Sequence, residues 1–268
     1  MTPHARRNVR SIAWAVAIGL AALSLCGCFN PFNPLIAKNR VGATDPPPYP
    51  SRADLVVRLF EWCWDHRSIA EYEEIFTDDF QFEFAATDTA GNAFRDRALT
   101  RFDEIETARH LFVGGGSSPP ANSITLQLDQ NLITQPDSRR GRSNDYTHFK
   151  LIVTSVVLRI KTDEEEFQVT GAARFFLVRG DSALIPAELQ ARGFRSDSTR
   201  WYIQRWEDET VGSGPVANSA VRARGGAWLA ARRPGSEGSR AVSRDAVQSP
   251  PLDVTWGFVK RVFYPTGR

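Results

Sequence analysis

The sequence is poor in the residues that build metal centres. Its 268 residues include three cysteines and four histidines. His66, His110 and His148 show no short-range ligand spacing such as H-x-x-x-H, and they have no C-x-x-C pair to work with. This excludes the common local zinc motifs. We therefore predict no metal site and no cofactor.

Motifs for covalent catalysis and phosphate binding are missing as well. The chain contains neither a G-x-S-x-G nucleophile motif nor a Walker lysine motif. The run Gly114-Gly115-Gly116 follows a predicted helix instead of preceding one, so it lacks the helix N-terminus whose amides would hold a phosphate. None of these patterns supplies a catalytic residue.

The sequence has no apolar run long enough for a comfortable transmembrane helix. Ile12–Leu25 falls below the roughly 18–20 apolar residues that span a bilayer comfortably. Three arginines precede it between residues 6 and 10, and it ends in Leu25-Cys26-Gly27-Cys28. A basic start, a short apolar core and small residues at the end favour a cleaved export signal over a permanent transmembrane helix.

This segment resembles a bacterial lipoprotein signal peptide that ends in a lipobox. The resemblance implies that Cys28 receives diacylglycerol, becomes the new N-terminus and carries acyl chains such as palmitate, which anchor the protein to the membrane. Phe29 stands where an aspartate would favour the inner membrane, so we expect the periplasmic face of the outer membrane. The alternatives are an uncleaved anchor helix and an ordinary secretory signal with accidental cysteines.

The lipoprotein interpretation also decides the fate of the remaining cysteine. With Cys26 removed and Cys28 acylated, Cys63 is alone, and no intramolecular disulfide is expected. Cys63 lies between Trp62 and Trp64 in a helical pattern. This position favours a buried structural thiol over a nucleophile.

Composition divides the chain into five parts. We assign residues 1–27 to the signal peptide, 28–50 to a proline-rich tether, 51–210 to one folded domain, 211–251 to a Gly/Ser/Arg-rich linker and 252–268 to an aromatic segment that docks on the domain. The linker has too few large apolar residues for its own core. Its arginines alternate with Gly and Ser, and an envelope protein meets no nucleic acid. We predict a solvated linker, with weak attraction to anionic lipid or cell-wall polymer as the alternative.

Residues 51–210 show helical periodicity first and strand periodicity afterwards. In the first helix, the apolar stripe behind an N-cap at Ser51 would consist of Leu55, Leu59 and Trp62. In the third, it would consist of Phe102, Ile105, Ala108 or Arg109, and Phe112. The expected helices span 51–66, 68–76 and 100–112, the last with a capping box between Thr100 and Asp103. The expected strands span 80–84, 123–133, 146–161, 166–180 and 199–210.

The order helix, helix, strand, helix and four strands predicts an α+β fold with one core. The opening SRADLVVRLFEWCWDHRSIAEYEEIFTDDFQFEF and the last strand RWYIQRWED resemble nuclear transport factor 2-like proteins, the group of polyketide cyclases and steroid isomerases. The resemblance implies a cone of three N-terminal helices packed on a strongly bent antiparallel sheet, with a pocket between them. By analogy it also implies a homodimer through the open face of the sheet.

The same resemblance argues against the known chemistry of the steroid-isomerase branch. The positions of its general-base aspartate and its oxyanion-binding tyrosine fall on Phe84 and Phe60. Proton abstraction next to a carbonyl needs both groups, so we predict no catalytic residue. The polar and aromatic side chains expected to line the pocket are Trp62, His110, Arg174, Tyr202 and Trp206.

Together these patterns predict a membrane-anchored periplasmic lipoprotein. Its domain would bind an envelope protein or a small apolar ligand without catalysis. The alternative is an enzyme of the isomerase, dehydratase or cyclase type that acts on a small ring-bearing substrate through His110 or another pocket group. A purely structural role in envelope attachment is the third interpretation.

Overall fold

The computed structural model describes residues 45–85, 88, 98–115, 119–212 and 251–264. The expectations for the signal peptide, for Cys28 and for the linker lie outside these residues, as do those for most of the tether. None of the helices in the described ranges combines the length and the apolar character that a membrane crossing requires.

The described residues form five helices and eight strands. In chain order these are α2 (Ala53–His66), α3 (Ile69–Glu73), β1 (Phe76–Glu83), β2 (Leu99–Thr100), α5 (Arg101–Phe112), β3 (Ser123–Leu128), β4 (Thr134–Pro136), β5 (Phe149–Lys161), β6 (Glu166–Arg179), α6 (Ala187–Ala191), β7 (Trp201–Val211), β8 (Leu252–Asp253) and α8 (Trp256–Phe263).

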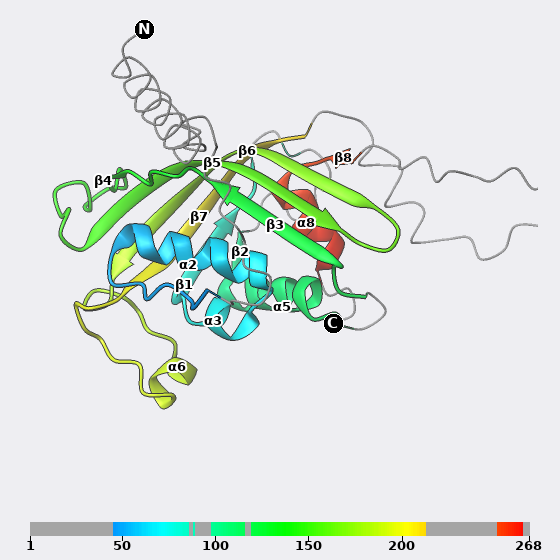
Figure 1. The fold of residues 1–268 in the computed structure, drawn as a ribbon. Helices are drawn as coiled ribbons and strands as arrows, with labels where there is room; N and C mark the ends of the chain where they lie inside the picture. The colour runs from blue at the N-terminus through cyan, green and yellow to red at the C-terminus, as the bar shows by residue number, and fades with distance from the viewer. Residues whose placement is uncertain (1–44, 86–87, 89–97, 116–118, 213–250, 265–268) are drawn as a thin grey trace, which may run out of the picture. The chain divides into compact units, whose positions relative to one another are not determined.

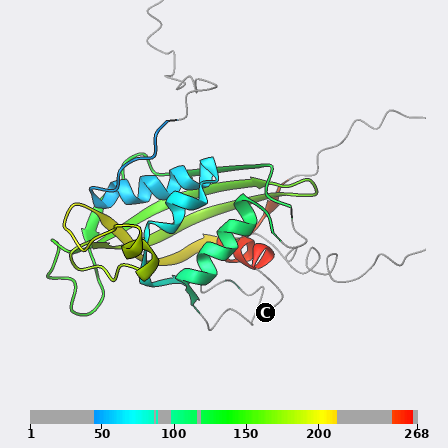
Figure 2. The same cartoon turned by 90° about the horizontal axis from the view of Figure 1, so that it is seen from below.

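The strands build one curved sheet in the order β2-β1-β7-β6-β5-β3, to which β4 adds at β5 and β8 at β6. The three longest strands, β5, β6 and β7, are consecutive antiparallel neighbours, whereas β1 runs parallel to β7. Helices α2, α3, α5 and α8 lie on one face of this sheet (Figures 1 and 2). The predicted fold class, an α+β fold of helices on a strongly bent sheet, is confirmed.

A β-bulge in β7 changes which side chains face the helices. Phe176 of β6 pairs with Arg205, but the next residue, Leu177, pairs with Ile203, so Gln204 has no partner in the ladder. Side chains alternate between the two faces of a strand, and one extra residue reverses this alternation. As a result, Ile203 and Trp206 both point into the main core, although an odd and an even position normally face opposite sides.

Local signals placed one helix start correctly and another wrongly. The Thr100 hydroxyl accepts a hydrogen bond from the Asp103 N–H, and the Asp103 carboxylate accepts one from the Thr100 N–H, which confirms the capping box of α5. The prediction of Ser51 as the N-cap of α2 is wrong. Arg52 occupies that position without a side-chain cap, and its guanidinium pairs with Asp54 at 2.6 Å.

The predicted apolar stripes of two helices are correct in part. In α2, Leu59 is buried as predicted, whereas Leu55 and Trp62 are only partly buried; the fully buried side chains are those at 56, 57, 60, 63 and 64. In α5, Ile105, Ala108 and Phe112 are buried as predicted, but Phe102 is 51% exposed and Glu104 points inward. Glu104 shares its helix face with Ala108 and Leu111, at spacings of four and seven residues, so a carboxylate lies in an otherwise apolar stripe.

Side chains of α2 cover the outer edge of β3. The Asp65 carboxylate accepts the N–H of Leu126 at 2.7 Å, and the Glu61 carboxylate, one helical turn earlier, accepts the N–H of Leu128 at 2.9 Å. Arg58 continues the row by donating to the carbonyl of Gln130 at 2.7 Å. An edge strand otherwise leaves these groups without a partner, so α2 satisfies hydrogen bonds that a further strand would normally make.

We predict that Glu61→Ala lowers the free energy of unfolding by about 1–2 kcal/mol, because the N–H of Leu128 then loses its charged acceptor. Urea denaturation followed by circular dichroism measures this change. The control is Glu164→Ala, at an exposed position of the β5–β6 turn, which should stay within about 0.5 kcal/mol of the wild type. Equal losses in both variants would contradict the role of Glu61 at the strand edge.

Candidate functional site

The space between the sheet and the helices is filled with aromatic rings. Phe60 of α2 lies at the centre of this cluster, with five ring centroids between 5.1 and 6.0 Å from its own. These belong to Trp64, Tyr72, Phe175, Trp206 and Trp256. All six side chains are at most 1% exposed. The pocket that the resemblance implied is therefore occupied by a packed core, to which α8 contributes Trp256.

A buried ion pair lies inside this aromatic core. The ammonium of Lys260, from α8, donates to both carboxylate oxygens of Glu104, from α5, at 2.5 Å each. The hydroxyl of Tyr72, from α3, donates to the same carboxylate at 2.6 Å. Lys260 is 2% exposed, and the other two side chains are fully buried. A buried charge is tolerated when it is paired and hydrogen-bonded in this way.

Aromatic rings surround the ammonium on its remaining sides. The Nζ atom of Lys260 lies 4.3 Å from the ring centroid of Trp206, 4.6 Å from that of Phe82 and 6.0 Å from that of Trp64. These distances are typical of cation–π contacts, which are strongest where water is excluded. Burial lowers the pKa of Lys260, and the carboxylate of Glu104 opposes this shift. We call these three rings, together with Glu104, the ammonium box.

The start of α8 is held by polar groups at the end of β7. The Asp208 carboxylate accepts the N–H of Gly257 at 2.9 Å, and the Thr210 hydroxyl accepts the N–H of Trp256 at 2.8 Å. Asp88 binds Arg261 through both carboxylate oxygens at 3.0 Å. A Cβ atom on Gly257 would lie 2.4 Å from an Asp88 oxygen, so only glycine permits this close approach.

Two residues of the predicted pocket set lie in or beside the core. Trp206 is fully buried and forms part of the ammonium box. Trp62 is partly buried at the border of the core, where its ring stacks on that of His66 at a centroid distance of 4.2 Å.

The other three residues of that set lie elsewhere. Arg174 forms ion pairs with Glu207 at 3.5 Å and with Glu209 at 3.6 Å. His110 lies in the last turn of α5, beside Gly115. Tyr202 belongs to a second apolar cluster with Val178, Ile185 and Leu189. The structure therefore does not gather the five predicted residues around one cavity. The bulge at Gln204 explains why Tyr202 and Trp206 are separated despite their even spacing.

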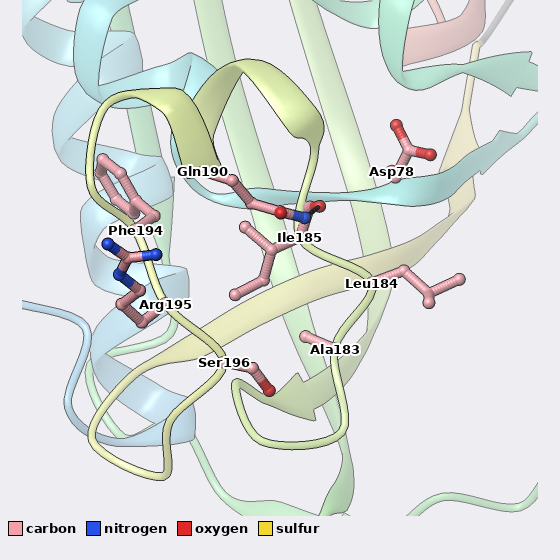
Figure 3. Close-up of a pocket in the computed structure, with 8 residues that line it drawn as sticks. All are labelled: Asp78, Ala183, Leu184, Ile185, Gln190, Phe194, Arg195 and Ser196. Atoms are coloured by element: carbon pink, nitrogen blue, oxygen red, sulfur yellow. Dashed lines mark hydrogen bonds between the residues drawn. The ribbon is translucent and has the colours of Figure 1, made fainter.

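An open hollow lies in the loop between β6 and β7. Its volume is about 390 Å³, which falls in the range of small-molecule sites. The lining residues are Asp78, Ala183, Leu184, Ile185, Gln190, Phe194, Arg195 and Ser196. Figure 3 shows that all of them come from the loop except Asp78, which comes from β1. Half of the lining is apolar and half can form hydrogen bonds or ion pairs.

The loop that forms the hollow is fixed to the rest of the domain. The N–H of Asp78 donates to the carbonyl of Leu184 at 2.8 Å. Arg101 of α5 pairs with Glu188, and Arg192 pairs with Glu74 of the α3–β1 connection. Ile185 and Phe194 also pack in the cluster of Tyr202. The hollow therefore has a supported floor, while Leu184 on its rim is 59% exposed.

Within the described ranges, no three His, Cys, Asp or Glu side chains form a set that could hold a metal ion. Cys63 is fully buried, and burial raises the pKa of its thiol far above the usual range. This thiol is therefore protonated at neutral pH and is a poor nucleophile.

No protein-family model matches the chain, and no curated protein sequence matches it. Among solved structures, a candidate scytalone dehydratase from Novosphingobium aromaticivorans is 11% identical with a TM-score of 0.38, covering 57% of this chain and 78% of that one. A conserved protein from Planctomyces limnophilus is 9% identical with a TM-score of 0.38, covering 59% and 95%. A protein with a cystatin-like fold from Caulobacter vibrioides is 10% identical with a TM-score of 0.36, covering 64% and 94%. Likenesses this distant concern the fold and say nothing of activity.

We predict that Asp208→Asn gains stability relative to the wild type as the pH rises from 4 to 7. Burial raises the pKa of Asp208 from its ordinary value of 3.8 to about 6. The folded state therefore holds a proton that the unfolded chain releases, and the stability contributed by this carboxyl is lost as the pH passes through about 6. Asparagine keeps an acceptor oxygen for Gly257 without this loss. Urea midpoints measured at each pH give the difference.

The control for this prediction is Asp163→Asn, at an exposed turn, whose difference from the wild type should not follow the same pH curve. A difference between Asp208→Asn and the wild type that stays constant from pH 4 to 7 would contradict the raised pKa.

Proposed function

We propose that this protein is a lipid-anchored envelope lipoprotein whose domain binds a small apolar or amphipathic ligand, or a short segment of an envelope protein, without catalysis. The observation that carries the proposal is the contrast between the filled space inside the cone and the open hollow in the β6–β7 loop. The cone is filled by aromatic rings and by Lys260, whereas the hollow of about 390 Å³ in the β6–β7 loop is open.

The lining of the hollow indicates the kind of ligand. Leu184, Ile185 and Phe194 offer apolar contact, and Arg195 and Gln190 offer a charge and hydrogen-bonding groups near them. Pockets of this mixed type bind an apolar body and orient it through a few polar groups. The best fit is a compact apolar molecule that carries an anionic or hydrogen-bonding group.

The alternative of an isomerase, dehydratase or cyclase rests on one observation. Glu104 and Tyr72 form a carboxylate–phenol pair inside the cone, 2.6 Å apart, and such a pair can exchange protons with a substrate. Lys260 fills the place that the substrate would need, and this favours binding over catalysis. Turnover of a ring-bearing substrate that is abolished by Glu104→Gln would reverse this preference.

For the hollow, we predict that Leu184→Asp weakens binding of the fluorescent probe 1-anilinonaphthalene-8-sulfonate roughly fivefold to tenfold, since the apolar contact of one leucine is lost. The probe combines aromatic rings with a sulfonate that Arg195 can attract. The matched control is Ile133→Asp, because Ile133 is 68% exposed and does not line the hollow. Equal binding by both variants and the wild type would overturn the hollow as the ligand site.

For the anchor, we predict that Cys28→Ser releases the protein from the membrane fraction into the soluble periplasm. The lipobox resemblance makes this thiol the acceptor of diacylglycerol, and serine cannot form the thioether. Fractionation of cells followed by immunoblotting measures the change, with Cys63→Ser as the control that should stay with the membrane. Continued membrane attachment of Cys28→Ser would overturn the lipoprotein assignment.

A further inference from the structure

The ammonium box and its occupant come from two different parts of the chain. Trp64, Phe82, Glu104 and Trp206, which form the box, all lie before residue 212, and Lys260 alone supplies the cation. The residues before 212 therefore form a binding site, and the Lys260 side chain occupies it as a ligand would.

Lys260 reaches the box from a segment that is far from the box residues in the sequence. A Cβ atom on Gly212 would lie 3.4 Å from the Cα of Val254, so the two ends are in contact, although residues 213–253 lie between them in the sequence. Moreover, the eight residues of α8 are too few to form a stable helix in isolation. Contacts with the rest of the domain therefore determine where α8 lies: the box holds Lys260, Asp208 and Thr210 bind the start of the helix, and Asp88 binds Arg261.

Lys260 satisfies the box only in part. The indole N–H of Trp206, a member of the box, is buried and has no hydrogen-bond partner among the described residues. Folded proteins leave few buried donors unpaired, and the lysine side chain has no acceptor to offer them. A molecule with an ammonium group and an oxygen acceptor could satisfy both Glu104 and a neighbouring indole.

The geometry also selects the type of cation. The Lys260 ammonium gives two hydrogen bonds to Glu104, and its other sides face aromatic rings. A quaternary ammonium has no N–H to donate, and a guanidinium is planar and larger. A primary alkylammonium group matches both the carboxylate and the rings.

We propose that the ammonium box is a binding site for primary alkylammonium groups, occupied in cis by Lys260, and that a small amine-bearing molecule can take this place. The site is separate from the hollow of the β6–β7 loop, and neither assignment depends on the other. The other buried contacts of α8 hold Lys260 in the box as well, so a free amine enters most readily once the Lys260 ammonium is removed.

The test removes the tethered occupant from the full-length protein. Lys260→Ala deletes three methylenes and the ammonium, which together match n-propylammonium. Added n-propylammonium at 10–50 mM should raise the Tm of this variant by about 4 °C or more, following the mass-action law for a ligand of the folded state. The wild type should shift by less than about 1 °C, because Lys260 already fills the box.

Two controls separate recognition of the cation from filling of a cavity. 1-Propanol has a similar size without the charge, and it should not raise the Tm of Lys260→Ala. In the double variant Lys260→Ala/Glu104→Gln the carboxylate is gone, and n-propylammonium should lose its effect. Equal stabilisation by the alcohol and the amine, or no stabilisation of a folded Lys260→Ala by the amine, would overturn the proposal.

If Lys260→Ala does not fold, the wild type decides the question. Phenethylammonium at up to 100 mM should speed amide hydrogen exchange in residues 256–263, because it displaces α8, while exchange in β5 and β6 stays unchanged. Unchanged exchange in residues 256–263 over that range would overturn the proposal. Faster exchange throughout the domain would do the same, since it would report unfolding and not displacement.

Discussion

The ion pair between Lys260 and Glu104 is the constraint on which the rest of the domain depends. Leaving either charge alone in the aromatic interior would cost about 3–5 kcal/mol, so each holds the other's element in place. Through this pair α8 is fixed against α5, Trp256 is set between Trp64 and Trp206, and the space under the sheet is closed. Tyr72 extends the same network to α3.

Local patterns predicted much of this fold, because they depend on neighbours in the chain. The alternation of Phe80 and Phe82 with polar residues placed them in the core from a strand, and the capping box between Thr100 and Asp103 located the start of α5. The three long strands and their antiparallel order followed from β-branched runs separated by turn residues.

The candidate sites were harder to predict, because they depend on contacts that no local pattern contains. Glu104 and Lys260 are 156 residues apart, and neither belongs to a motif. One signal was available: Glu104, Ala108 and Leu111 share a helical face, and a carboxylate in such a stripe needs a buried partner. The predicted stripe consisted of the apolar positions of this helix and so left Glu104 out.

The bulge at Gln204 shows a second reason why sequence patterns do not predict the site. Period-two reasoning assigns Tyr202 and Trp206 to one face of β7, but one extra residue separates them, and no composition rule marks where a strand bends. The hollow is likewise a product of tertiary structure. All of its lining except Asp78 comes from the β6–β7 connection, whose shape depends on ion pairs with α5 and with the α3–β1 connection.

The carboxylates that α2 presents to β3 have a consequence for how copies of this protein can meet. Chains that are held side by side on a surface reach high local concentrations, and a bare strand edge would then let one sheet continue into the next. In this protein, a strand from a second copy would have to displace Glu61 and Asp65 from two backbone amides of β3 before it could pair with β3. At this edge, the growth of one sheet into the next is thereby blocked.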